Sequence, residues 1–412
     1  MNQNLFHFGI LLSNIVDKKA FLNAVLSDNN EGKLRVFNGY KGALFSDLTI
    51  AQYIESEHRH HTIEITKAQN RFLHTFSSGE RRKALLDHCL AQKPDYIIFD
   101  SLFDHLDVPS RKELSSQLLE LSKSISIIQV EHRKDSVLPF IRNVGYVQDN
   151  SFVISDVPEI VQTKKNKIAT DFPSSLMFFK KDYETIIKFD KVSIHYDDTP
   201  IVTNINWKVQ PGEFWQLIGP NGSGKSTLLS MITGDNPKAY GQDIMIFDRK
   251  KGSGESIWEL KRKIGYFSTN LAELFKRNHT VEQMIVSGFF DSIGLYRKPS
   301  GLQQQKAKQW LDVIEMKHLK DSYFNRLPLG QQRLVLIARA LIKQPPLLIL
   351  DEPFEGLDTE NVDLVAQLIN TLVEKTQITI IYVSHTVEEA LAPSHIYELI
   401  PTEDGSLGQI KL

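Results

Sequence analysis

The strongest constraint on the fold of this chain is an internal repeat, because a duplicated sequence predicts a duplicated structure. Four blocks of the first half match four blocks of the second half, three at one constant offset and one with a slip of two residues. At 412 residues the chain is long enough for two domains, since single cores rarely exceed about 250 residues. We expect domains at 1–148 and 183–412, joined by a polar linker at 149–182. The matched pairs are Phe76–Arg82 with Leu327–Arg333, Tyr96–Asp100 with Leu347–Asp351, Leu106–Asp107 with Leu357–Asp358, and Ile127–His132 with Ile380–His385.

Apolar periodicity in the second half predicts an α/β fold. Leu347–Leu350 and Thr379–Val383 are continuous apolar runs of the kind that parallel sheets bury on both faces. The apolar residues of 334–341 recur instead at helical spacing, and a double proline at 345–346 ends that helix. Strands that alternate with helices indicate a mainly parallel sheet with helices packed against it.

A glycine-rich loop carries the clearest chemical signal. It follows the predicted strand Phe214–Ile218, precedes a predicted helix, and matches the pattern G-x-x-x-x-G-K-[ST]. Glycines let successive backbone N–H groups face a phosphate, and the N-terminus of the helix adds positive partial charge. Lys225 would reach the β- and γ-phosphates, while the Ser226 hydroxyl would hold Mg²⁺. We expect ATP to bind to Gly219, Pro220, Asn221, Gly222, Ser223, Gly224, Lys225, Ser226 and Thr227.

Two adjacent carboxylates follow one of the buried strands. Asp351 and Glu352 come directly after Leu347–Leu350. Such a pair is often just a solvated strand end, but beside a phosphate loop it matches the needs of phosphoryl transfer. We expect Asp351 to bind Mg²⁺ and Glu352 to act as the general base that activates the attacking water. The sequence therefore predicts an ATPase with ATP and Mg²⁺ as its cofactors.

These motifs resemble those of the ABC ATPase family. Leu350–Pro353 and Gly356–Asp358 are similar to its Walker B and D-loop segments, and Ser384–His385 is similar to its switch histidine. The resemblance implies a P-loop α/β fold with a helical subdomain in each half. It also implies that His385 contacts the γ-phosphate and that Tyr196 stacks on adenine.

A finer resemblance concerns the ATP-binding proteins of molybdate transport. Segments 286–296 and 329–333 are similar to the tandem ATPases linked to that transport, the ModF group. This likeness covers most of the second half and, more loosely, the first. One residue departs from the transporter pattern, because 267–270 lacks the Q-loop glutamine that links Mg²⁺ to the membrane partner in the family.

The first half has lost the residues that a nucleotide site needs. Residues 12–20 lie opposite the glycine-rich loop in the repeat and keep Lys18, but the glycines are gone and Lys19 replaces the Mg²⁺-binding serine. Ser101 replaces the catalytic Glu352. Too few residues precede this point to supply the first strands and an adenine-stacking aromatic. We expect a truncated half that does not hydrolyse ATP on its own loop.

The losses in the two halves are complementary. Paired halves of the ABC family join the loop of one half to the signature segment of the other. Ser77 and Gly79 keep the important signature positions of the first half, whereas Pro328 and Leu329 replace the Ser and Gly of the second. The family geometry therefore implies intramolecular pairing with one working site, which joins Ser77 and Gly79 to the loop at Lys225.

Composition limits where such a protein acts. The chain has a net charge of −2 and one cysteine, Cys89, which indicates neither a nucleic-acid-coating protein nor a disulfide framework. No segment is apolar over the roughly 20 residues that a membrane span needs. The polar stretch Glu57–His61 has no metal-ligand spacing and is expected to be solvated. We expect a cytoplasmic protein, peripheral on the inner face of the cell membrane when it is bound to a permease.

Two functions from different classes fit these features. The first is the energising subunit of an ABC importer, of the molybdate type by resemblance, with an ABC permease chain as its partner. The second is a soluble tandem ABC regulator or ribosome-associated translation factor that is not coupled to transport. Such factors resemble one another in a long charged helical linker, and 149–182 contains Pro158 and Pro173 instead. No direct contact with nucleic acid is expected.

Overall fold

The computed structural model divides the chain into two compact units. Unit 1 comprises Met1–His105, Ser110–Gln162 and Gly356–Thr359, and unit 2 comprises Leu106–Pro109, Thr163–Glu355 and Glu360–Leu412. The residues described are 5–27, 30–66, 71–76, 78–104, 106–150, 152–156, 168–169, 171–177, 179, 182–269, 271–275, 278–385 and 388–411.

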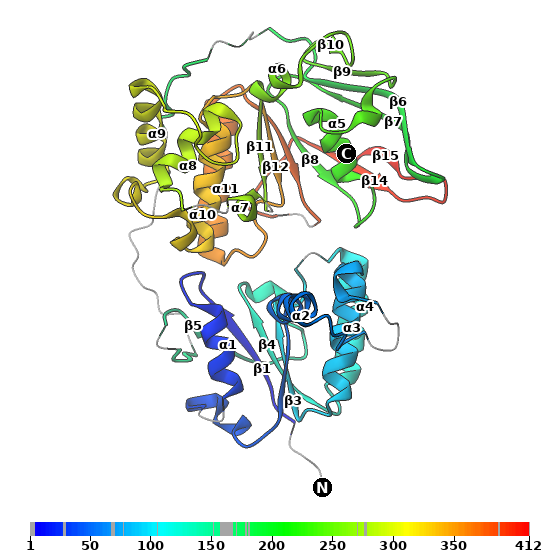
Figure 1. The fold of residues 1–412 in the computed structure, drawn as a ribbon, viewed down its shortest axis with the longest axis vertical. Coiled ribbons are helices and arrows are strands. Elements are labelled where there is room, and N and C mark those ends of the chain that lie inside the picture. The colour runs from blue at the N-terminus through cyan, green and yellow to red at the C-terminus, as the bar shows by residue number, and fades with distance from the viewer. Residues whose placement is uncertain are drawn as a thin grey trace. The chain divides into compact units, whose positions relative to one another are not determined.

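The first half is built on a five-stranded sheet in which each strand pair is parallel. The strand order is β2-β3-β4-β1-β5, and β3, β4, β1 and β5 are labelled in Figure 1. Every residue of the interior strands β3 and β4 is buried, including the polar side chains of Asp100, Gln129 and Glu131. The strands are β1 (His7–Leu12), β2 (Gly42–Phe45), β3 (Tyr96–Asp100), β4 (Ser126–Glu131) and β5 (Asn143–Val147).

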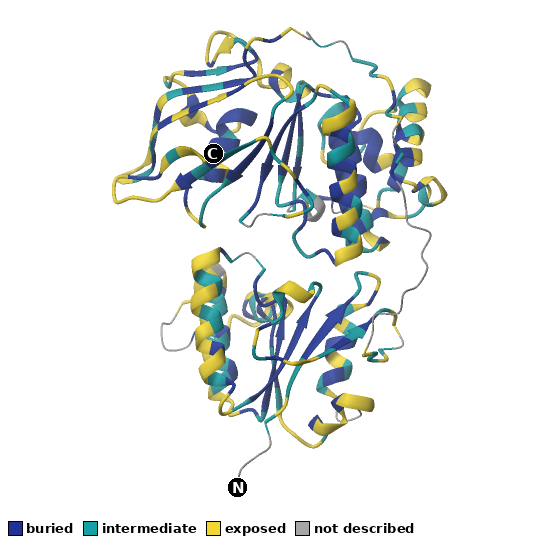
Figure 2. Ribbon diagram, turned by 180° about the vertical axis from the view of Figure 1, so that it is seen from behind, coloured by how far each residue is buried: buried dark blue, intermediate teal, exposed yellow. Residues whose placement is uncertain are grey.

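Helices connect these strands, as parallel pairing requires. Helix α1 leaves β1 and buries Phe21, Leu22 and Val25 against the sheet. Figure 2 shows dark-blue strands and helices whose outer faces are exposed. The α-helices are α1 (Lys18–Leu26), α2 (Asp47–His60), α3 (Ser78–Ala91) and α4 (Val108–Leu121), and the short 3-10 helices are η1 (Gly32–Phe37), η3 (Leu73–Thr75) and η4 (Lys134–Ser136).

The second half contains two sheets. One has six strands in the order β11-β12-β13-β8-β14-β15, parallel except for the antiparallel pair β14–β15. The other is antiparallel, with the order β10-β9-β6-β7. The strands are β6 (Ile187–Tyr196), β7 (Thr199–Val209), β8 (Phe214–Ile218), β9 (Ile244–Ile246), β10 (Arg249–Lys250), β11 (Ile264–Ser268), β12 (Leu347–Asp351), β13 (Thr379–Val383), β14 (His395–Ile400) and β15 (Leu407–Lys411).

The helices of the second half match the periodic segments of the sequence. Capping boxes begin α6, α8 and α9, and Gly234 ends α5 in the left-handed conformation. The α-helices are α5 (Lys225–Thr233), α6 (Ile257–Arg262), α7 (Leu271–Leu274), α8 (Val281–Ser287), α9 (Gly301–Val313), α10 (Leu329–Leu341) and α11 (Thr359–Lys375). The 3-10 helices are η5 (Pro237–Ala239), η6 (Gly288–Phe290), η7 (Lys317–Leu319) and η8 (Phe324–Arg326).

The strand orders of the two parallel sheets confirm the predicted duplication. In each sheet the first strand in the chain lies between the fourth and the fifth, as β1 lies between β4 and β5 and β8 lies between β13 and β14. Among the described residues of the first half there is no counterpart of the antiparallel sheet, and β1 is the first strand described. The predicted duplicated α/β fold is therefore correct.

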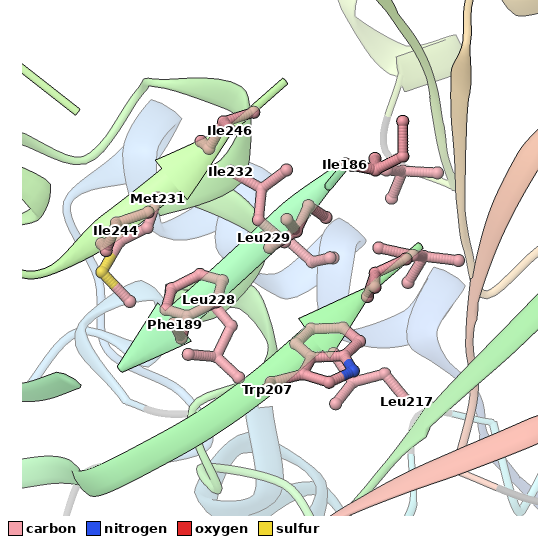
Figure 3. Packing of buried hydrophobic residues seen from close by; sticks show 14 of the residues in the cluster. Ile186, Phe189, Trp207, Leu217, Leu228, Leu229, Met231, Ile232, Ile244 and Ile246 are labelled. Carbon is pink, nitrogen blue, oxygen red and sulfur yellow. The ribbon is translucent and has the colours of Figure 1, made fainter. Parts of the chain in front are cut away.

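The core of the second half holds its phosphate-loop helix in place. Leu228, Leu229, Met231 and Ile232 of α5 are buried in one apolar cluster with residues of both sheets (Figure 3). Trp207 of β7 joins the same cluster. Complete burial of each such side chain contributes roughly 1.5–3 kcal/mol, so α5 is a rigid support for the loop before it.

Part of the segment expected to be a linker packs on the second half. Two of its contacts are with residues of α9. Ala169 N–H donates to the carbonyl of Val313 (3.0 Å), and the Phe172 ring lies 5.7 Å from the ring of Trp310. The Ser175 hydroxyl donates to the Lys343 carbonyl (3.1 Å). The lysine-rich run at 164–167 lies outside the described residues. Among the residues that are described, no helix is long and apolar enough to cross a membrane.

Candidate nucleotide site

The glycine-rich loop connects β8 to α5, as its sequence predicts. Gly222 and Gly224 have φ angles of 77° and 94°, which residues with a Cβ rarely adopt. A Cβ on Gly224 would also lie 2.6 Å from Val202 Cγ1. Gly224 is the N-cap of α5 and has no side chain to block the first N–H groups of the helix. These groups are therefore free of a side-chain cap and suited to an anion.

The loop presents both a cation and a hydroxyl to such an anion. Lys225 is buried, and its ammonium donates to the carbonyl oxygens of Gly219 (2.7 Å) and Pro220 (3.0 Å). Burial lowers the pKa of Lys225, with nearby carboxylates opposing that shift. Ser223 Oγ is buried without a hydrogen-bond partner among the described residues. A buried hydroxyl without a partner in the loop fits a phosphate oxygen as its acceptor.

The acidic pair lies at the end of β12. Both neighbours of β12 are parallel strands, so Asp351 and Glu352 emerge at the carboxyl edge of the sheet. Glu352 has φ 53°, a strained conformation that aims its side chain, and its N–H donates to the Val383 carbonyl (3.0 Å). Burial raises the pKa of Asp351, and a hydrogen bond from Tyr266 (3.4 Å) opposes this shift.

His385 connects the carboxylate to the lysine. Its Nε2 lies 3.1 Å from Glu352 Oε1, and its Nδ1 lies 3.4 Å from Lys225 Nζ. Burial, followed by the charge of Lys225, lowers the pKa of His385 to about 4, so the ring is neutral at pH 7. Since an ammonium can only donate, Nδ1 is the acceptor in its contact with Lys225. The structure thus places the His385 ring within 3.1 Å of the Glu352 carboxylate and within 3.4 Å of the Lys225 ammonium.

The residues expected to hold Mg²⁺ offer only oxygen atoms. Ser226 is exposed in the first turn of α5, and Asp351 is partly buried at the end of β12. A hydroxyl and one carboxylate suit Mg²⁺, which keeps several waters and binds substrate phosphates. The described residues contain no cluster of three or more His, Cys, Asp or Glu that would make a metal site of protein ligands alone. This set therefore fits an ion that arrives with a nucleotide.

Tyr196 ends β6 in the antiparallel sheet, and its side chain is 42% exposed. Its hydroxyl accepts a hydrogen bond from Asn236 Nδ2 (2.9 Å), and Lys238 Nζ lies 5.3 Å from the centre of its ring. An exposed ring of this kind is available to stack on a base. Sequence reasoning missed Asn236, because it lies in an irregular stretch with no motif around it.

The corresponding loop of the first half has a different structure. None of the described residues 12–20 has a positive φ, in contrast to the glycines of the second half. Asp17 takes the N-cap position of α1, and its carboxylate accepts from Ala20 N–H (3.0 Å). A fixed anion therefore occupies the end of the helix where a phosphate would bind. The expectation that 12–20 is not a phosphate loop agrees with this geometry.

Lys18 is engaged within the protein. Its ammonium lies 3.1 Å from Asp100 Oδ1 and donates to Ser101 Oγ (3.2 Å). The Asp100 side chain is only 3% exposed and also accepts from the Ser46 hydroxyl (2.6 Å). Ser101 has φ 48°, like its counterpart Glu352, so the strained backbone remains although a serine stands in place of the glutamate. A nucleotide phosphate would have to displace Asp100 from Lys18.

Glu131 is a second buried carboxyl in the first half that sequence reasoning did not single out. It ends β4, is 4% exposed, and accepts from Leu102 N–H (3.0 Å) and Gln129 Nε2 (2.8 Å). Burial raises the pKa of Glu131 to about 8, with nearby Asp104 adding to the shift. Its counterpart in a catalytic half would be a small polar residue such as Ser384, so this carboxyl belongs to the first half alone.

The signature segments begin the helices α3 and α10. Gly79 lies exposed in the first turn of α3, and Ser77 lies outside the described residues. Pro328 is the N-cap of α10, and its side chain cannot accept a capping hydrogen bond from the helix N–H groups. Leu329 is the first residue of that helix. The second signature thus lacks the hydroxyl that a phosphate would meet.

Each unit includes one short aspartate-containing segment from the other half of the sequence. Leu106–Pro109 belongs to unit 2, and Gly356–Thr359 belongs to unit 1. Within unit 2, Asp107 Oδ2 accepts from Asn221 N–H in the glycine-rich loop (3.0 Å). Within unit 1, Asp358 Oδ2 accepts from Asn14 N–H (2.7 Å). Both loops therefore have an aspartate on the backbone of their asparagine, a contact that no sequence motif indicated.

The histidine-containing stretch Glu57–His61 is not a metal site in the described structure. The expectation that it is solvated is wrong for Glu57, which is 1% exposed and accepts from Leu73 N–H (2.7 Å). The His58 ring stacks on His74 at 4.8 Å. Both contacts join α2 to η3 and are structural.

Comparisons with known proteins agree with this geometry. Residues 202–355 match the family model described as ABC transporter. The chain is 40% identical over 360 residues to the ABC transporter ATP-binding protein ModF of Escherichia coli (strain K12), covering 83% of this chain and 73% of that protein. It is 31% identical over 321 residues to an uncharacterized ABC transporter ATP-binding protein of Schizosaccharomyces pombe, covering 76% of this chain and 65% of that protein.

A solved structure extends the likeness to both halves. The archaeal ribosome recycling factor, in complex with an archaeal ribosomal stalk protein, gives a TM-score of 0.61 over 98% of this chain and 85% of that one. Sequence identity is 18%, so this similarity concerns the fold alone.

Proposed function

Because the chain belongs to the family of ABC transporter ATP-binding proteins and is an ABC-type ATPase, we propose that it energises an ABC importer through a single competent nucleotide site. The observation that carries the proposal is the contact of His385 with both Glu352 and Lys225 (3.1 and 3.4 Å). In contrast, the equivalent lysine of the first half is paired with Asp100.

ATP binds to the second half through the loop 219–227. The N–H groups of the loop and of the first turn of α5 receive the phosphates, and Ser223 Oγ donates to one of their oxygens. Lys225 exchanges its two carbonyl acceptors for phosphate oxygens, which favours its charged form. Ser226 and Asp351 would hold Mg²⁺, which would neutralise phosphate charge in the reaction.

Hydrolysis uses the pair Glu352 and His385. Glu352 accepts a proton from the attacking water, which then adds to the γ-phosphorus as the bond to the β-phosphate oxygen breaks. His385 Nε2 lies 3.1 Å from the carboxylate of Glu352, and the ring is neutral, so it stands beside the base without cancelling its charge. ADP and inorganic phosphate leave the site.

The signature of the first half completes this site in our proposal. Ser77 and Gly79 face the γ-phosphate when the halves pair, as the family resemblance implies. The opposite combination joins a loop capped by Asp17 to a signature that begins with Pro328. One site is therefore complete, and the other lacks its phosphate ligands on both sides.

The partner in this proposal is an ABC permease in the membrane, and the protein acts on the cytoplasmic side of it. The importer is of the molybdate type, which rests on the resemblance to the ModF group and on the 40% identity to ModF of Escherichia coli. The packed segment around Phe172 supports a transport role over that of a factor with a long helical linker.

Two experiments test the proposal. Glu352→Gln should bind ATP with unchanged affinity and release phosphate at least 100-fold more slowly, because the amide cannot accept the proton. Ser101→Ala, at the equivalent position of the first half, is the matched control and should keep the normal rate. Retained turnover in Glu352→Gln would remove the carboxylate from the mechanism.

The transport role is tested with the same variant. Tagged Glu352→Gln protein in Mg²⁺ and ATP should co-purify with an integral membrane permease from detergent-solubilised membranes, and molybdate uptake should fall in cells that lack the wild-type chain. Ribosomal proteins in place of a permease would contradict the transport role and favour the translation-type alternative.

A further inference from the structure

The exposed ring of Tyr196 is held by a residue that belongs to no motif of the family. Tyr196 is the last residue of β6, and the chain turns at Asp197, which has φ 50°. A half-exposed side chain at a strand end can adopt several rotamers, and binding a base would have to select one of them. The hydroxyl of the ring, however, accepts a hydrogen bond from Asn236 Nδ2 at 2.9 Å.

Asn236 is itself fixed on all of its polar groups. It is 4% exposed, and its Nδ2 also donates to Ser230 Oγ (3.2 Å). Its Oδ1 accepts from Lys238 N–H (3.0 Å), and its own N–H donates to the Ser230 carbonyl (3.0 Å). Three hydrogen bonds to the buried side-chain amide restrict its rotamer, so the ring hydroxyl has a fixed donor.

The anchor leads back to the phosphate loop. Ser230 lies on α5, the helix that begins at Lys225, and its hydroxyl donates to the Thr227 carbonyl (2.8 Å). Asn236 follows that helix and returns to Tyr196 in the antiparallel sheet. The ring that would receive the base is therefore tied to the same rigid helix whose first turn would receive the phosphates.

We propose that Asn236 is a positioning residue for the base of ATP: it sets the distance and orientation of Tyr196 relative to the phosphate loop. Lys238 Nζ, 5.3 Å from the centre of the ring, supports one side of the ring through a cation–π contact. This inference rests on the proposed function, in which Tyr196 stacks on adenine. A preorganised ring raises affinity because less rotamer freedom is lost on binding.

The test compares two ligands that differ only in the nucleoside. ATP needs both the ring and the loop, whereas inorganic tripolyphosphate needs the loop alone. In the full chain, Asn236→Ala should weaken ATP binding about 3- to 10-fold, the typical range for one hydrogen bond, and leave tripolyphosphate binding within twofold. Isothermal titration calorimetry in the presence of Mg²⁺ measures both dissociation constants.

Tyr196→Phe removes the same hydrogen bond from an exposed position and serves as the second variant. It should weaken ATP binding to a similar degree, and the double variant should be no weaker than either single one. Tyr196→Ala should cause a larger loss for ATP, again with tripolyphosphate unchanged. Lys225→Ala should weaken both ligands.

Three results would overturn the inference. Asn236→Ala could weaken both ligands equally, which would mean a general effect on α5. It could leave ATP binding unchanged while Tyr196→Ala weakens it, which would remove Asn236 but keep the stacking role of Tyr196. Tyr196→Ala could leave ATP binding unchanged, which would refute the stacking itself, while Lys225→Ala reports separately on the loop.

Discussion

Replacing Lys18 should lower stability and leave ATP binding intact, whereas replacing the equivalent Lys225 should do the reverse. Lys18 forms an ion pair inside the first half, and Lys225 is expected to bind a phosphate. Lys18→Ala removes the cation beside Asp100, whose side chain is 3% exposed. Loss of one partner of a buried ion pair costs about 3–5 kcal/mol, and an exposed pair contributes about 0–1 kcal/mol. The Lys18 side chain is 30% exposed, and Asp100 keeps the Ser46 hydroxyl as a donor. We therefore expect the first half to lose about 1–3 kcal/mol.

Lys225→Ala should leave stability nearly unchanged. Its ammonium donates only to backbone carbonyls and a neutral imidazole, and burial disfavours its charge. The variant should instead lose ATP binding. In Lys18→Ala, ATP affinity and turnover per folded molecule should equal those of the wild type. Lys19→Ala, at the next and exposed position, is the matched control and should change stability by less than about 0.5 kcal/mol.

Urea unfolding can separate the two halves. All four tryptophans lie at positions 207, 215, 258 and 310, so their fluorescence reports the second half alone, whereas far-ultraviolet circular dichroism reports both. With a urea m-value of about 1–3 kcal/mol/M, Lys18→Ala should lower the midpoint of the circular dichroism transition of the first half by about 1 M. The tryptophan transition should move less.

A single result would refute this reasoning. If Lys18→Ala kept the stability of the first half but abolished ATP hydrolysis as completely as Lys225→Ala, the loop at Lys18 would be a functional nucleotide site. The proposal of one competent site would then be wrong.

Three further predictions concern single groups. Gly224→Ala should abolish ATP binding and lower the stability of the second half by at least about 1 kcal/mol. The reason is that φ 94° and the nearby Val202 Cγ1 leave no room for a methyl group. Equilibrium binding measures the loss of ATP affinity, and urea unfolding followed by tryptophan fluorescence measures the loss of stability. The pKa of Glu131 is raised to about 8 in the folded state. Its contribution to stability is therefore fully present below its unfolded pKa and is lost as the pH rises toward 8. The urea midpoints at pH 6 and pH 8.5 should differ less in Glu131→Gln than in the wild type. Asp17→Ala should cost the first half about 1 kcal/mol through loss of the N-cap, and an unchanged urea midpoint would show that the cap contributes nothing.

Much of the fold could be predicted from the sequence because its signals are local. The buried strands β12 and β13 and the helix α10 were visible as apolar runs and helical spacing. The repeat then transferred this interpretation to the first half, where β3 and β4 lie at the matched positions. The two main sheets share the order of their first five strands, which follows from duplication and not from any local pattern.

The site divides in the same way. A loop that binds phosphate through consecutive backbone N–H groups must be written in consecutive residues, so Gly219–Thr227 could be recognised. The acidic pair was found because it ends a buried strand, whereas His385 was identified through the resemblance of Ser384–His385 to the switch histidine of the family. Asn236 could not be found from the sequence, because its proposed role depends on a hydrogen bond to Tyr196, 40 positions earlier in the chain. A polar residue in an irregular stretch looks the same whether it is buried or solvated.

The amino-acid sequence by itself determined that this chain is a duplicated P-loop ATPase with one intact phosphate loop and one eroded one, because glycines and periodic apolar residues act through their immediate neighbours. Only the tertiary structure decided what the eroded loop became. It brings Lys18 to Asp100, places Asp17 on the end of α1 and buries Glu131 without a cation of its own among the contacts described. Charges in a low-dielectric interior depend on which distant side chains surround them, and that information exists only once the chain has folded.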